Sequence, residues 1–190
     1  MPGAKVDPMN TYQTAFDTAE RLLARALPRR WRHVQAVGRK ALEVGTQLFP
    51  EESTDILAMA AILHDVGYSP ALVKTGFHPL DGARWLRTEG WDERVVALVA
   101  HHSCATIEAD ERGLRKELES EFVNEDSAVT QALWFCDMTT GPDGNDLEVE
   151  VRLAEILERY GPDHVVTRFI RRARPLILDA VRQTEQRLAA

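Results

Sequence analysis

Histidines and aspartates at the ends of apolar stretches are the residues of this sequence best suited to do chemistry. His64 and Asp65 follow the apolar run "AAIL" at residues 60–63, and Asp137 follows the apolar stretch "ALWFC". A carboxylate beside such a run is costly to bury unless it is paired or binds a metal ion. We interpret these residues as part of a metal site, with structural hydrogen bonding as the alternative.

Most of the six histidines lie on, or at an end of, a predicted core helix. They are His33, His64, His78, His101 and His102, whereas His164 stands apart beside a Gly-Pro pair. Helical bundles build metal sites from inward-facing side chains on several facing helices. Imidazole and carboxylate together suit Fe, Mn, Co, Ni or Zn better than Ca or Mg alone. The pattern therefore predicts divalent metal ions inside a bundle.

Apolar residues recur at helical spacing along most of the chain, and no convincing strand pair interrupts them. The predicted helices span residues 11–27, 30–48, 54–66, 78–89, 92–102, 127–138, 147–159 and 163–188. The mostly polar segment 104–126 reads as a surface excursion with a short helix. We expect an all-α fold in one domain over 1–190, with a metal-binding core at about 30–140 and helices 147–188 packed on it.

Composition limits the kinds of partner that this protein can have. The 190 residues carry a net charge of -7, which argues against general binding to nucleic acid or to an anionic membrane. The start "MPGAKVDPMN" has no long apolar core and predicts no signal peptide. Cys104 and Cys136 make no disulfide framework. We expect a cytoplasmic protein, and the sequence is compatible with a homo-oligomer.

The order His33, His64-Asp65, Asp137 resembles the HD superfamily of metal-dependent phosphohydrolases over about residues 30–140. The segments "HPLDGARWL" and "LVAHH" are similar to those that supply a second metal in its binuclear members. The resemblance implies an HD-type helical bundle with one metal ion on His33, His64, Asp65 and Asp137. It implies a second ion on His78 and His101, with Asp65 as the bridging catalytic carboxylate.

Of the adjacent residues His101 and His102, we expect only one to bind the metal. Adjacent helical positions point about 100° apart, so both rings rarely ligate one binuclear site. We predict His101 as the ligand and give His102 a catalytic role facing the substrate. A solvent-exposed His102 is the alternative.

The resemblance implies hydrolysis of a phosphate ester or anhydride of a nucleotide or small phosphorylated metabolite by a metal-activated hydroxide. Arg30, Lys74 and Tyr68 are the candidate substrate contacts, with surface charge as the alternative for Arg30 and Lys74. Tyr68 stands where many members have the Lys of "HDxGK". The layout is similar to bacterial symmetric diadenosine tetraphosphate hydrolases and to mixed-valence di-iron oxygenases. A catalytically inactive HD module that binds a ligand or protein is a further alternative.

Overall fold

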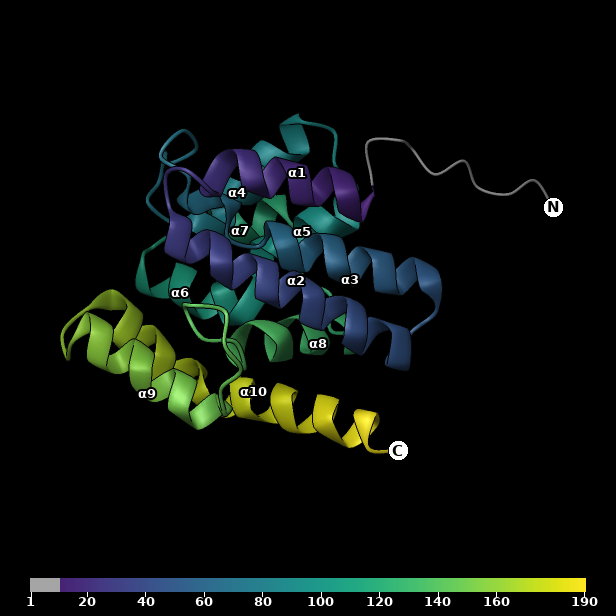
Figure 1. The fold of residues 1–190 in the computed structure, drawn as a ribbon. Helices are drawn as coiled ribbons and strands as arrows, with labels where there is room; N and C mark the ends of the chain where they lie inside the picture. The colour runs from purple at the N-terminus through teal and green to yellow at the C-terminus, as the bar shows by residue number, and fades with distance from the viewer. Residues whose placement is uncertain (1–10) are drawn as a thin grey trace.

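The computed structural model describes residues 11–190, and helices make up most of that part of the chain (Figure 1). The predicted all-α fold is confirmed. Within the described residues, no helix combines the length and apolarity needed to cross a membrane. The expectation that the first ten residues form no signal peptide lies outside the described residues.

The helices follow the predicted order, with shifts at their ends. In the first half they are α1 (Tyr12–Leu23), α2 (Pro28–Leu48), α3 (Glu51–Leu63), α4 (His78–Thr88) and α5 (Glu93–His101). In the second half they are α6 (Ala105–Glu111), α7 (Arg115–Glu121), α8 (Ala128–Met138), α9 (Val149–Tyr160) and α10 (Val165–Leu188). Two 3-10 turns, η1 (Val66–Tyr68) and η2 (His102–Cys104), follow α3 and α5. The excursion at 104–126 contains two short helices rather than one.

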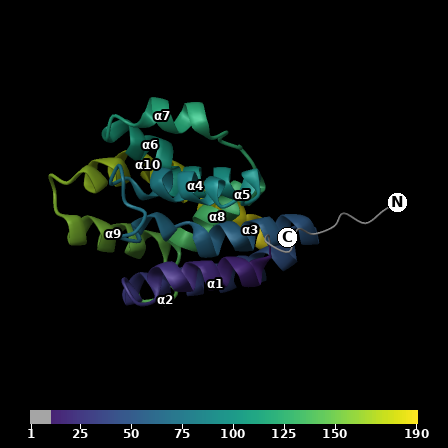
Figure 2. The ribbon, with the colours of Figure 1, turned by 90° about the horizontal axis from the view of Figure 1, so that it is seen from above.

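Helix α3 runs through the centre of the bundle and carries the His-Asp pair at its end. All its residues from Ile56 to Leu63 are buried, and it contacts α1, α2, α5 and α8. A helix that is apolar on every side is stable only when it is surrounded by other elements. Figure 2 shows α3 between α1 and α2 on one side and α4 and α5 on the other. His64 and Asp65 therefore emerge inside the protein.

The last two helices form a hairpin that packs on α8 beside the end of α3. Buried apolar residues of α9 and α10, such as Leu153, Phe169 and Ile177, share a core cluster with Met138 of α8. Figure 1 shows this hairpin along the lower edge of the bundle, away from α1. The hairpin therefore brings side chains from the end of the sequence close to the candidate site.

Candidate metal centre

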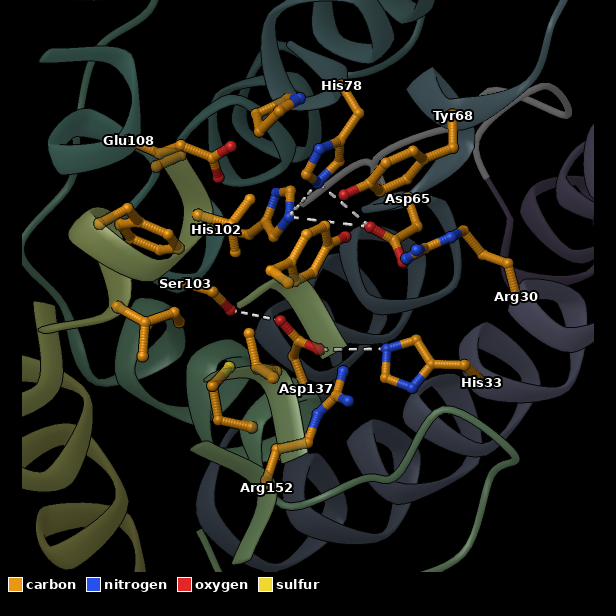
Figure 3. A pocket seen from close by; sticks show the side chains of 18 of the residues that line it. Arg30, His33, Asp65, Tyr68, His78, His102, Ser103, Glu108, Asp137 and Arg152 are labelled. Carbon is orange, nitrogen blue, oxygen red and sulfur yellow. Dashed lines mark hydrogen bonds and ion pairs between the residues drawn. The ribbon is translucent and has the colours of Figure 1, made fainter. Parts of the chain in front are cut away.

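The candidate side chains form a cluster at a cavity where distant parts of the chain converge (Figure 3), and all members of the cluster except His64 line that cavity. The side chains that meet are His33 of α2, His64 and Asp65 after α3, His78 of α4, His102 after α5 and Asp137 of α8. All but His78 are less than a tenth exposed. Within the described residues they form three overlapping groups whose ligand atoms are close enough to hold a metal ion.

One half of the cluster contains two histidines and two carboxylates. Nε2 of His33 lies 3.1 Å from Oδ1 of Asp137. Nε2 of His64 lies 3.4 Å from Oδ2 of Asp65 and 3.8 Å from Oδ1 of Asp137. Two buried carboxylates with imidazole nitrogens between them form a donor set typical of a transition-metal site.

The other half of the cluster shares Asp65. Nε2 of His78 lies 3.2 Å from Oδ1 of Asp65 and 3.1 Å from Nε2 of His102. Nε2 of His102 is itself 4.0 Å from that carboxylate oxygen. Asp65 therefore turns one oxygen toward each half, an arrangement that would suit a ligand shared by two ions.

Backbone carbonyls fix the orientation of three of these rings. The Nδ1 atoms of His33, His64 and His102 lie 3.0, 2.7 and 2.7 Å from the carbonyl oxygens of Gly141, Ala61 and Val99. A carbonyl oxygen only accepts, so Nδ1 of each ring carries a proton, and Nε2 is the nitrogen that each ring turns toward the cluster. Histidines that bind metals almost always have such a support for the second nitrogen.

His64 supplies the clearest sign that a cation is required. Among the described residues, its buried Nε2 atom has no hydrogen-bond partner, although it faces Asp65 and Asp137. Burial lowers the pKa of His64, but the Asp65 and Asp137 carboxylates and the Ala61 carbonyl together outweigh burial and raise this pKa to about 9. A proton on Nε2 thus offsets the carboxylate charges in the protein alone. A metal ion at the same place would offset the charges of Asp65 and Asp137 and would also bind Nε2 of His64. The residues therefore fit a metal ion.

His102 differs from His64 because it is kept neutral. Burial, together with the neighbouring His64 and His78 rings, lowers the pKa of His102 to about 3. A neutral ring with its Nε2 lone pair facing His78 and Asp65 is ready to bind a metal without first losing a proton.

Both carboxylates remain ionised despite their burial. Burial disfavours the charged form of Asp65, but the Arg30 guanidinium and the His64 ring hold its pKa well below its usual range. Burial also opposes ionisation of Asp137, yet a hydrogen bond from His33 and the charge of His64 lower its pKa. The Ser103 hydroxyl donates to Oδ2 of Asp137 at 2.5 Å. The pocket is therefore anionic where metal ions would bind.

A kink after α5 brings His102 into the cluster. Ser103 and Cys104 have φ angles of 47° and 62°, a left-handed conformation that non-glycine residues rarely adopt. Backbone strain of this kind persists only where the surrounding structure enforces it, and it gathers at functional sites. Here it turns the chain so that the His102 ring and the Ser103 hydroxyl both face the cavity.

The prediction that His101, rather than His102, joins the cluster is wrong. Nε2–H of His101 donates to the carbonyl of Phe122 at 3.0 Å, and its Nδ1 accepts from Thr106 at 3.1 Å. This ring is therefore saturated by protein groups outside the cavity. The prediction assumed one regular helix through both histidines, whereas α5 ends at His101 and the chain then turns. His102 takes the position beside His78.

A glycine lets the His-Asp turn touch the first turn of α4. A Cβ atom on Gly67 would lie 2.0 Å from the carbonyl oxygen of His78 and 2.7 Å from the amide nitrogen of Gly82. Only a residue without a side chain allows this approach. The contact sets the position of His78 opposite Asp65.

Arg30 and Tyr68, two of the three predicted substrate contacts, line the cavity. Arg30 forms an ion pair with Asp65, and its guanidinium carbon lies 3.7 Å from the centre of the Tyr68 ring. Tyr68 also stacks on His78, with ring centres 3.9 Å apart. The third residue, Lys74, is exposed on the loop before α4 and lies outside the lining of the cavity.

Several residues at the cavity were missed by the sequence analysis. Glu108 of α6 and Arg152, Arg159 and Tyr160 of α9 also line it. Their sequence context is an ordinary charged amphipathic helix, so nothing in the pattern marked them. Ser103 was missed as well, because its role depends on the kink that follows α5.

Comparison with known proteins identifies one family. A family model described as HD domain matches residues 30–160, well over half of the chain. No curated protein and no solved structure matches the sequence. The matched range contains all six residues of the cluster and extends through α9.

Proposed function

The chain belongs to the HD domain family, and from that premise we propose that it is a metal-dependent phosphohydrolase. Its substrate would be a phosphate ester or anhydride of a nucleotide or small phosphorylated metabolite. The observation that carries the proposal is the buried Nε2 atom of His64, which faces two ionised carboxylates without a hydrogen-bond partner among the described residues. Such an arrangement calls for a cation, and this family's chemistry uses one.

We assign the ligands by the two halves of the cluster. His33, His64, Asp65 and Asp137 would hold one divalent ion, and Asp65, His78 and His102 a second. The donor set accepts Fe, Mn, Co, Ni or Zn. When bound, such ions activate water as a nucleophile and offset the charge that develops on phosphoryl oxygens.

The protein's own groups position the ligands and the substrate. Ser103 holds Asp137 through its hydroxyl, and Tyr68 fixes the His78 ring by stacking. Arg30 neutralises Asp65 in the protein alone. With Asp65 held as a metal ligand, the planar guanidinium of Arg30 would be available to bind phosphate oxygens in a bidentate manner.

The remaining parts of the proposal concern location and partners. Both cysteines, Cys104 and Cys136, are free and buried, which fits a reducing cytoplasm. The expected partner is a small phosphorylated molecule rather than a nucleic acid.

The test is reconstitution with metals followed by a substrate screen. Protein freed of metal by chelation would be loaded separately with Mn, Fe, Co, Ni and Zn, and then assayed for phosphate release from nucleotides and phosphomonoesters. We expect phosphate release that depends on added metal and is lost in Asp65→Ala together with bound metal. Lys74→Ala, an exposed change outside the cavity, is the matched control. Full turnover without metal would contradict the proposal, and oxygen uptake in step with turnover would indicate the oxygenase instead.

A further inference from the structure

A second cavity opens beside the metal centre and is lined by basic residues. It shares Arg30, His33, Arg152 and Arg159 with the metal cavity, so the two cavities adjoin each other. Its volume of about 310 Å³ exceeds the roughly 80 Å³ beside the cluster. None of the described residues that line it is acidic, although the chain as a whole carries a net charge of -7.

Arg152 lies at the junction of the two cavities and is incompletely paired. Its side chain is 8% exposed, and among the described residues its buried Nε atom has no hydrogen-bond partner. Figure 3 shows the side chain reaching from α9 toward Asp137 and His33. A buried guanidinium donor without an acceptor is costly, unless a ligand supplies the acceptor.

Two arginines of α9 share a single carboxylate at this junction. Arg152 donates to Oε2 of Glu155 at 2.7 Å, and Arg159 donates to both oxygens of the same carboxylate at 2.9 and 2.5 Å. One carboxylate thus serves two guanidinium groups. Arg30 adds a third positive charge, paired only with Asp65, which the proposed function assigns to metal ions. An anion at the junction would complete the pairing of all three.

The rest of the second cavity is largely apolar. Ala26, Leu27, Pro28 and Pro142 line it together with the arginines. An anionic group at the junction could therefore continue into a flat or apolar group that packs against this wall. A smaller ligand, such as a single phosphate, would also fit, but it would leave this apolar surface unused.

We propose that Arg152 and Arg159 bind a second, non-reacting phosphate group, so that the preferred substrates carry at least two linked phosphates. This inference rests on the proposed function, because it places the reacting phosphate at the metal centre. Arg30 lies between the two positions and contacts both phosphates. The two arginines of α9 act as specificity-determining residues rather than as catalytic ones.

The test compares binding of inorganic phosphate and inorganic pyrophosphate to the metal-loaded full chain by titration calorimetry. We expect the unmodified protein to prefer pyrophosphate. Arg159→Gln should weaken pyrophosphate binding about tenfold, equivalent to about 1.4 kcal/mol, and change phosphate binding less than about twofold, since that anion sits at the metals. Arg152→Gln should have the same effect. Arg152→Lys should recover part of the pyrophosphate binding, because lysine restores the positive charge but not the paired hydrogen bonds of a planar guanidinium.

Arg168→Gln is the matched control, because this α10 arginine pairs with Glu111 and lies outside both cavities. Equal weakening of both anions in the Arg159 and Arg152 variants, or no weakening of either, would overturn the inference while leaving the phosphohydrolase proposal intact. If Arg152→Gln fails to fold, Arg159→Gln decides alone, since that side chain is 29% exposed. Absence of binding and of hydrolysis for every phosphate compound would overturn the proposed function and this inference together.

Discussion

Replacing Gly67 by alanine should separate the His-Asp turn from α4 and remove the second metal. The added Cβ atom would lie 2.0 Å from the carbonyl oxygen of His78, whereas ordinary contact begins at 3.4 Å. The two backbones must therefore part by about 1.4 Å, the difference between these distances. His78 Nε2 now lies 3.2 Å from Oδ1 of Asp65, and a shift of that size takes the ring out of bridging range.

The expected loss is large for activity and modest for stability. A misplacement of about 1 Å can lower the rate roughly 100-fold, and overpacking of this kind costs about 1–3 kcal/mol of folding free energy. We expect Gly67→Ala to bind one equivalent of metal instead of two and to lose about two orders of magnitude in kcat/KM. Elemental analysis, steady-state kinetics and urea denaturation measure the three quantities.

Gly90→Ala provides the matched control. Gly90 has a φ of +81° and nothing within 4 Å of an added Cβ atom, so alanine there strains the backbone without touching the cluster. We expect it to lower stability by about 1–2 kcal/mol and to keep the full metal content. Two metals and unchanged kcat/KM in Gly67→Ala would refute the claim that this contact positions His78.

Further predictions concern the histidines and their supports. His102→Ala should lose bound metal, whereas His101→Gln should keep it and lose about 1–3 kcal/mol of stability through unsatisfied buried partners; equal metal contents in the two variants would contradict the assignment. Ser103→Ala should weaken metal affinity about 10–100-fold by releasing Asp137, as measured by competition with a chelator, and an unchanged affinity would show that the hydroxyl is dispensable. Metal binding should release a proton from His64, because its pKa is raised to about 9 in the protein alone. Affinity should therefore increase as the pH rises toward 9 and level off above it. Calorimetry in buffers of different ionisation enthalpy detects the proton, and affinity independent of pH between 7 and 9 would be inconsistent with this reasoning.

The central part of the site could be predicted because it depends on helix ends. His64 and Asp65 follow a run that is apolar on every side, so the end of that helix had to lie inside the protein. His33 and Asp137 each lie on a helix with a strong buried face. The apolar residues around each of these side chains predict its burial, and the family resemblance then predicts that the four side chains meet.

Other parts of the site depend on tertiary structure and left no such signal. A left-handed kink at Ser103 and Cys104 determines that His102, and not His101, joins the cluster. Serine and cysteine are not residue types that predict positive φ angles. Arg152 looks like any charged residue of an amphipathic helix, and it is buried only by the tertiary packing of α9, which contacts α10 and α8. Lys74 shows the converse, because nearness in sequence to the His-Asp pair did not bring it to the cavity.

The most direct test of a metal centre is a crystal structure of protein reconstituted with manganese, measured with anomalous scattering at the manganese absorption edge. We predict an anomalous peak bound by Nε2 of His64 together with Asp65 and Asp137, and a second one bound by His78, His102 and Asp65. The buried Nε2 atom of His64 would then have its missing partner. A map without anomalous density there, with His64 still ion-paired with the two carboxylates as in the protein alone, would contradict the assignment of this cluster as a metal site.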